Sequence, residues 1–202
     1  MSGFDVDNLK NPKDFYTAFK NTWDDCKPPW KNDFVLRDAE WTNWFERSMR
    51  RLVEQAARGI HCQNRFGGAE EWMKVDHVFV LKNAYDSFPI IAVEHENGSL
   101  GSPDNELADP EGKAAIEWAL WKVLSMRSHL AVLVAYPGSK KENRTIEVAE
   151  QMLAAWQQEY SPKTKVLILL GPASGTAQLG GPFYRSLEWD AAEKRLKQKN
   201  WD

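Results

Sequence analysis

The sequence has few cysteines and no long apolar run. Only two of its 202 residues are cysteines, Cys26 and Cys62. No stretch of about 18 apolar residues predicts a membrane-spanning helix. The N-terminus also lacks the charged-then-apolar pattern of a secretory leader. These absences predict a cytoplasmic protein with no membrane partner and with both thiols reduced.

The chain also lacks a large excess of charge of one sign. Its 26 lysines and arginines against 29 aspartates and glutamates give a formal net charge of -3. A small protein that holds nucleic acid by charge alone carries a strong positive excess, so such a contact would need a local basic patch. The length and the hydrophobic fraction of 43% fit a single domain, residues 1–202, with one substantial core.

Helical and strand patterns alternate along the chain. Apolar residues at helical spacing predict helices over 11–24, 38–58, 113–127 and 142–159. Apolar runs between turn residues predict strands over 60–66, 72–82, 88–97, 130–138 and 165–172. We further expect an edge strand at 183–189 and an amphipathic C-terminal helix. This order predicts an α/β domain with a central mixed β-sheet flanked by helices.

Three carboxylates interrupt two of the apolar strands, in the stretch KVDHVFVLKNAYDSFPIIAVEHEN (74–97). Glu94 and Glu96 lie on one face of their strand because side chains alternate across a strand. A hairpin centred on residues 83–88 brings Asp76 opposite the mid-nineties. Carboxylates this close repel one another unless a cation lies between them, and hard oxygen ligands select Mg²⁺, Mn²⁺ or Ca²⁺. The alternative is a solvated strand end with a surface aspartate.

These residues resemble the motif of the PD-(D/E)xK nuclease superfamily, the restriction-endonuclease-like proteins. The family has an αβββαβ core with an acidic residue at the start of the second strand and Glu-x-Lys at the end of the third. Asp76 and Glu94 match that pattern, whereas Glu96 stands where the lysine usually is, as in the Glu-x-Glu variant. Lys74-Val75 also replaces the Pro-Asp of the motif. On this resemblance the core covers about residues 38–172, with extensions at 1–37 and 173–202.

The resemblance implies a Mg²⁺- or Mn²⁺-dependent endonuclease that hydrolyses DNA, with Asp76, Glu94 and Glu96 as catalytic residues. The metal ligands would be Asp76, Glu94 and a glutamate of the helix at 38–58, for which Glu46 is preferred over Glu54. The positive charge of the missing lysine could come from a second metal or from Lys74, Lys82 or Lys113. The alternatives are a catalytically inactive module of the same fold that binds a protein or nucleic-acid partner, and a metal-dependent hydrolase on another α/β scaffold. RNA as substrate and a homodimer both stay open.

Nucleic-acid contacts are expected from five basic residues. Arg47, Arg51 and Arg58 share one side of the helix at 38–58, at i, i+4 and i+11. Lys74 and Lys113 flank the carboxylates in sequence. An ordinary solvated helix face, with arginines paired to Glu46 and Glu54, explains the stripe equally well.

Two competing sites have weaker support in the sequence. His61, Cys62, His77 and His95 lie on the expected strands, but their spacing matches no compact zinc motif, and core or surface histidines are favoured. The segment GPASGTAQLGGP (171–182) follows a buried strand but lacks the Lys-Ser/Thr of a phosphate-binding loop. We therefore expect neither to be the functional site.

Overall fold

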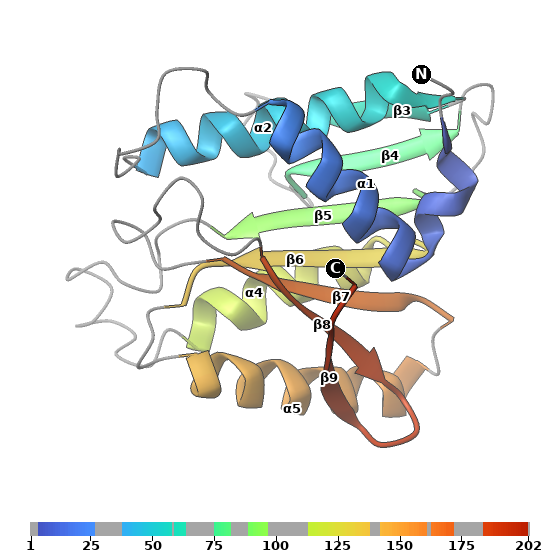
Figure 1. The fold of residues 1–202 in the computed structure, drawn as a ribbon. Helices are drawn as coiled ribbons and strands as arrows, with labels where there is room; N and C mark the ends of the chain where they lie inside the picture. The colour runs from blue at the N-terminus through green and yellow to red at the C-terminus, as the bar shows by residue number, and fades with distance from the viewer. Residues whose placement is uncertain are drawn as a thin grey trace, which may run out of the picture.

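The computed structural model describes residues 4–26, 38–57, 59–63, 75–81, 89–96, 113–137, 142–160, 163–171 and 184–201. They form a mixed seven-stranded sheet in the order β3-β4-β5-β6-β7-β8-β9 (Figure 1). Strands β3 (Gly59–Gln63), β4 (His77–Leu81) and β5 (Ile91–Glu96) are antiparallel neighbours. Strands β6 (Leu130–Ala135) and β7 (Lys165–Leu170) continue parallel to β5. The expected α/β class with a mixed sheet is confirmed.

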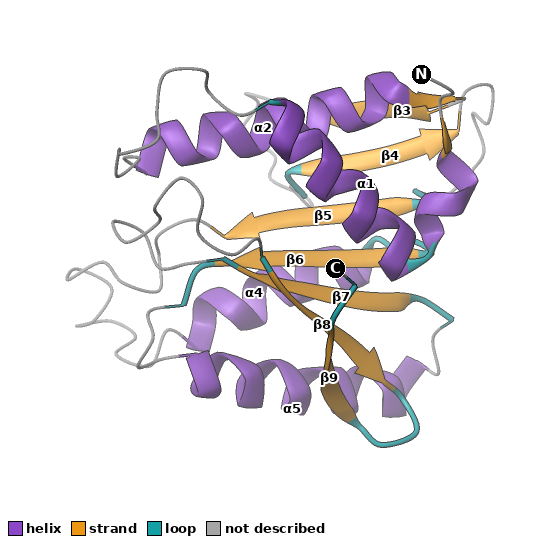
Figure 2. Ribbon diagram, viewed as in Figure 1, coloured by secondary structure: helices purple, strands orange, loops and turns teal. Residues whose placement is uncertain are grey.

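Helices cover both faces of this sheet (Figure 2). On one face lie α1 (Pro12–Asp25) and α2 (Asp38–Gln55), and on the other lie α4 (Lys113–Ser125) and α5 (Glu142–Tyr160). α1 begins as its sequence predicts, because the side chain of Asn11 accepts the backbone N–H of Lys13 and Pro12 occupies the first turn. The short elements before α1 are β1 (Phe4–Asp5) and a 3-10 helix (Val6–Lys10), and β1 pairs with β2 (Ala56–Ala57).

Each face of the sheet has its own core. Aromatic side chains of α1 and α2, such as Phe19 and Phe45, pack on one set of alternating strand residues, such as Val93 of β5 and Val132 of β6. Aliphatic side chains of α4 and α5 pack on the opposite set, such as Leu133 of β6. Every residue of β6 is buried, as a continuous apolar run predicts for a central strand.

Two elements differ from the sequence-based expectation. α2 ends at Gln55, because residues 56–57 leave the helix to pair with β1, so it does not reach residue 58. The C-terminal segment is not a helix but a hairpin of β8 (Arg185–Asp190), which pairs antiparallel with β7, and β9 (Arg195–Lys199), which pairs antiparallel with β8. The side chain of Asp190 accepts the backbone N–H groups of Ala192 and Glu193 in the turn, and Lys194 takes a left-handed φ of 52°. Pairing with the open edge of the sheet thus overrides the helical pattern.

Candidate functional site

Asp76 and Glu94 meet between β4 and β5. The pairs His77–Val93 and Val78–Ala92 set the register of these strands, and one more step places Asp76 opposite Glu94. The backbone N–H of Asp76 donates to Glu94 Oε2 at 3.3 Å, and the backbone N–H of His95 donates to Asp76 Oδ2 at 2.9 Å. The two carboxylates are therefore tied to each other's strand by a reciprocal pair of hydrogen bonds.

Lys122 of α4 completes this pair with a positive charge. Its ammonium group forms an ion pair with Glu94 Oε1, and the two side chains are only 13% and 3% exposed. α4 lies against β5 and β6, which puts Lys122 on the same face as Glu94. The sequence-based interpretation missed this residue. The available hint was that Lys122 is the only charged residue between Glu117 and Arg127, in an otherwise apolar helix.

Glu96 and Glu46 add two further acids. Burial raises the pKa of Glu96 to about 7, with a smaller contribution from the charge of Asp76. Burial also raises the pKa of Asp76, a rise that the His95 N–H and the charge of Lys122 oppose and the charge of Glu46 reinforces. Glu46 on α2 thus lies within electrostatic range of Asp76. Glu54 instead is exposed and pairs with Arg51 at 3.4 Å.

His95 supports the site from the opposite face of β5. Its ring stacks on Phe45 of α2, with centroids 4.0 Å apart, and its Nε2 lies 2.8 Å from the hydroxyl of Tyr136. That hydroxyl is 2.6 Å from the hydroxyl of Tyr184. Burial lowers the pKa of His95 to about 3, so the ring is neutral at physiological pH. His77 is also buried beside Phe45, and both histidines serve the core.

The donor chemistry of this cluster fits a hard divalent cation. Asp76 and Glu96 are desolvated carboxylates with raised pKa values, and a cation would stabilise their charged forms. In the part of the chain that the structure describes, no three His, Cys, Asp or Glu side chains stand ready as a ligand group. Mg²⁺ does not require one, since it commonly binds through one or two carboxylates and completes its shell with water and substrate phosphate.

Of the five residues expected to contact nucleic acid, the structure describes the side chains of Arg47 and Arg51. Arg47 and Arg51 are exposed on α2, and their charges act on the thiol of Cys26 at the end of α1. The expected three-residue stripe fails because the helix ends before residue 58. Arg58, Lys74 and Lys82 lie outside the described residues, as does nearly all of 171–182. Lys113 opens α4, and its side chain is not among those described.

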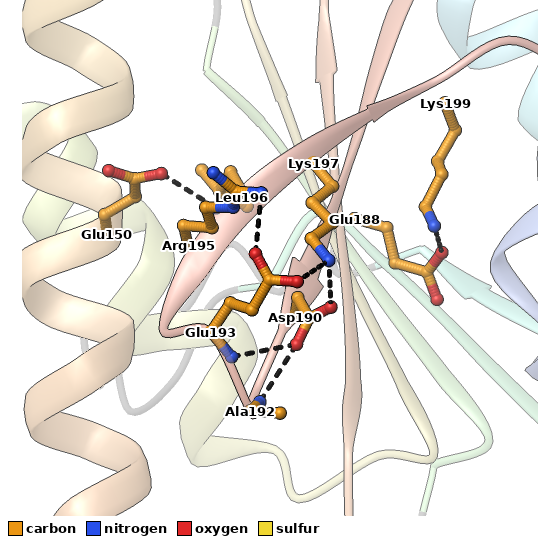
Figure 3. Close-up of polar contacts among 9 residues, drawn as sticks. All are labelled: Glu150, Glu188, Asp190, Ala192, Glu193, Arg195, Leu196, Lys197 and Lys199. Carbon is orange, nitrogen blue, oxygen red and sulfur yellow. Dashed lines mark hydrogen bonds and ion pairs between the residues drawn. The ribbon is translucent and has the colours of Figure 1, made fainter.

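The basic side chains of β9 are paired with acids of the same hairpin (Figure 3). Lys197 contacts Asp190 at 2.7 Å and also Glu193, Arg195 contacts Glu193 at 2.6 Å, and Lys199 contacts Glu188 at 3.4 Å. The Asp190 pKa is lowered to about 2, mainly by the hydrogen bond from Lys197. This ladder, which we call the β9 charge ladder, is locally neutralised and makes a poor phosphate-binding strip.

Comparisons with family models, curated proteins and solved structures give no match to this chain. Among the described helices, none combines the length and apolarity that crossing a bilayer requires. The fold and the cluster around Asp76 and Glu94 are therefore the basis for inferring function.

Proposed function

We propose that this chain is a metal-dependent nuclease with a restriction-endonuclease-like core, hydrolysing phosphodiester bonds in DNA. The observation that carries the proposal is the reciprocal hydrogen bonding of Asp76 and Glu94 at the end of β5, with Lys122 against Glu94. Apart from the two-residue strand β2, the elements α2, β3, β4, β5, α4 and β6 follow one another in the αβββαβ order. The acids lie where β5 ends, the end of a strand at which open α/β sheets bind ligands.

Each side chain has a distinct role in this proposal. Asp76 and Glu94 would hold Mg²⁺ or Mn²⁺, with Glu46 as a third acid whose charge acts on Asp76. When bound, the metal polarises the scissile phosphate and acidifies a bound water. Glu96, on the same face as Glu94, accepts the proton of the attacking water at a carboxylate oxygen.

Lys122 supplies the positive charge that Glu96 cannot. In the family pattern a lysine stands two residues after the glutamate, at the position of Glu96. Here an ammonium group reaches the same glutamate from the neighbouring helix α4. Its ammonium group could turn from Glu94 to a phosphate oxygen, because a lysine is a flexible point charge.

Cleavage of supercoiled plasmid and of single-stranded DNA, with Mg²⁺ or Mn²⁺ and with EDTA, tests the proposal. We expect metal-dependent cleavage that Asp76→Asn and Glu94→Gln each reduce by at least about 100-fold, the loss of one strong electrostatic contact in an active site. Glu188→Gln, which changes an acid on the distant hairpin, is the matched control and should cleave like the unmodified chain. If the unmodified chain fails to cleave with either metal, it is not a nuclease of this type.

The second candidate is an inactive module of the same fold. The observation favouring it is that Lys122 already neutralises Glu94, so that the pair is satisfied without a metal. Calorimetry with Mn²⁺ separates the two. The nuclease should show a heat of Mn²⁺ binding that is lost in Glu94→Gln, and it should also cleave DNA. An inactive module should show neither.

A further inference from the structure

Two tryptophans of α4 leave large apolar surfaces in water. Trp118 is 56% and Trp121 44% exposed, whereas Trp23 and Trp44 are each 5% exposed in the core. Their indole rings are stacked, with centroids 4.9 Å apart and planes inclined by 11°. The two rings are therefore nearly parallel, and together they leave an exposed aromatic surface.

The pair lies on the outer face of α4, next to Lys122. Ala119, Leu120 and Val123 turn toward the sheet and are fully buried. Trp118 and Lys122 are four residues apart and lie on adjoining strips of the helix, separated by about 6 Å along its axis. α4 begins on the side of the sheet where the arrowhead of β5 lies (Figure 1). Trp118 is thus displaced from Lys122 toward the end of β5 that carries Glu94 and Glu96.

The size of this surface fits a small planar ligand better than a protein. An aromatic side chain offers about 150–250 Å², so two half-exposed rings leave about 200 Å². A stable protein interface buries about 800 Å² on each partner, roughly four times as much. A third ring placed on the stack would cover one outer indole face.

We propose that Trp118 and Trp121 form a stacking platform for one unpaired nucleobase of the strand whose phosphate lies at the carboxylate cluster. The choice of a nucleic-acid strand rests on the proposed function, because the platform is about one helix turn from Lys122. Stacking itself requires neither the metal nor cleavage. Since both faces of a base are covered inside a duplex, the platform selects single-stranded or frayed ends.

Binding of fluorescently labelled 12-nucleotide oligomers in EDTA tests this without cleavage. Three probes share one label: oligo(dT), an oligomer with abasic sites through its central half, and a blunt duplex. We expect oligo(dT) to bind about tenfold tighter than the abasic oligomer, since base stacking contributes to affinity while the phosphates are the same. We also expect it to bind tighter than the duplex.

Trp118→Ala should remove most of the advantage of oligo(dT) over the abasic oligomer, and Trp118→Phe should retain much of it. Tyr160→Ala is the matched control, because Tyr160 is an exposed aromatic residue, 68% exposed, at the far end of the neighbouring helix α5. It should leave all three affinities unchanged. Equal binding of oligo(dT) and the abasic oligomer, or no binding of either, overturns the platform.

The outcomes separate this inference from the nuclease proposal. One outcome is base-dependent binding in EDTA that Trp118→Ala abolishes, without cleavage in Mg²⁺ or Mn²⁺. It supports the platform and contradicts the nuclease proposal. Cleavage without base-dependent binding supports the nuclease proposal and contradicts the platform. Sedimentation that shows a dimer dissolved by Trp118→Ala would identify the pair as a self-association surface and overturn the platform.

Discussion

Asp76 and Glu94 face each other across β4 and β5, and the backbone N–H of Asp76 donates to the Glu94 carboxylate at 3.3 Å. Main-chain pairing of the two strands places the two residues opposite each other, so this contact depends on the register. Glu94 is 2% exposed, and its other carboxylate oxygen takes the ammonium group of Lys122. The site is therefore a buried ion pair as well as a candidate metal centre.

Removing Lys122 alone should destabilise the protein strongly. Lys122→Met leaves the Glu94 charge buried without its cation, which costs about 3–5 kcal/mol in the free energy of unfolding. The double variant Lys122→Met with Glu94→Gln should recover most of that loss. Urea denaturation in EDTA measures both.

An exposed pair provides the control for this measurement. Arg51 and Glu54 are 51% and 56% exposed on α2. Arg51→Met should cost less than about 1 kcal/mol. Equal losses for Lys122→Met and Arg51→Met would contradict a buried ion pair at Glu94.

Lys122→Met should also move metal binding and catalysis in opposite directions. Without the ammonium group, Glu94 is available to Mn²⁺, and we expect affinity to rise by about tenfold, corresponding to about 1.4 kcal/mol. Cleavage should fall, because the phosphate loses its positive partner. Calorimetry and a cleavage assay on the same preparation measure the two effects. A joint fall in affinity and rate would mean that Lys122 only holds Glu94 in place.

Without metal, stability should depend on pH through Glu96. Its pKa is about 7 in the folded chain against 4.5 for the ordinary carboxyl group. Between these values the folded state keeps a proton that the unfolded state has released, so stability falls as pH rises from about 4.5 to 7. Asp76, whose pKa is also raised, acts in the same direction. In thermal unfolding in EDTA, the stability of Glu96→Gln relative to the unmodified chain should increase as pH rises over this range. Parallel stability profiles would contradict the raised pKa.

Gly171→Ala should destabilise the packing around Tyr136, whose hydroxyl lies next to the ring of His95. A Cβ at this position would meet the ring of Tyr136 and lie 2.8 Å from the Tyr184 ring. Both rings are buried and their hydroxyls are bonded to each other, so neither can move aside. We expect a loss of about 1–3 kcal/mol, the usual cost of overpacking. In a Tyr136→Ala background the same substitution should cost clearly less, and an unchanged cost would point to another cause.

The strands and their register could be predicted because they depend on local pattern. β6 and β7 are continuous apolar runs, and the alternation of β5 already separates Glu94 from Val93 and His95. Hairpin pairing then brings Asp76 opposite Glu94, as expected. These features need no knowledge of how the helices pack.

Long-range contacts could not be predicted in the same way. Lys122 is 28 residues from Glu94, and only the packing of α4 on β5 brings them together. The prediction of a C-terminal helix was wrong. Leu196 packs against the core and β9 forms its hydrogen bonds with β8, and the charged sequence indicates neither contact. The nuclease activity, the metal and the nucleic-acid contacts remain predictions.

The β9 charge ladder bears on how copies of the chain meet. β9 is the last strand of the described sheet, and an unprotected strand edge is a template for adding a strand from another molecule. Edge-to-edge pairing would bring Arg195, Lys197 and Lys199 close to the same residues of a second copy. Charge thus discourages intermolecular strand addition, and high salt should weaken this protection, making aggregation through β9 easier at 1 M salt than at low ionic strength.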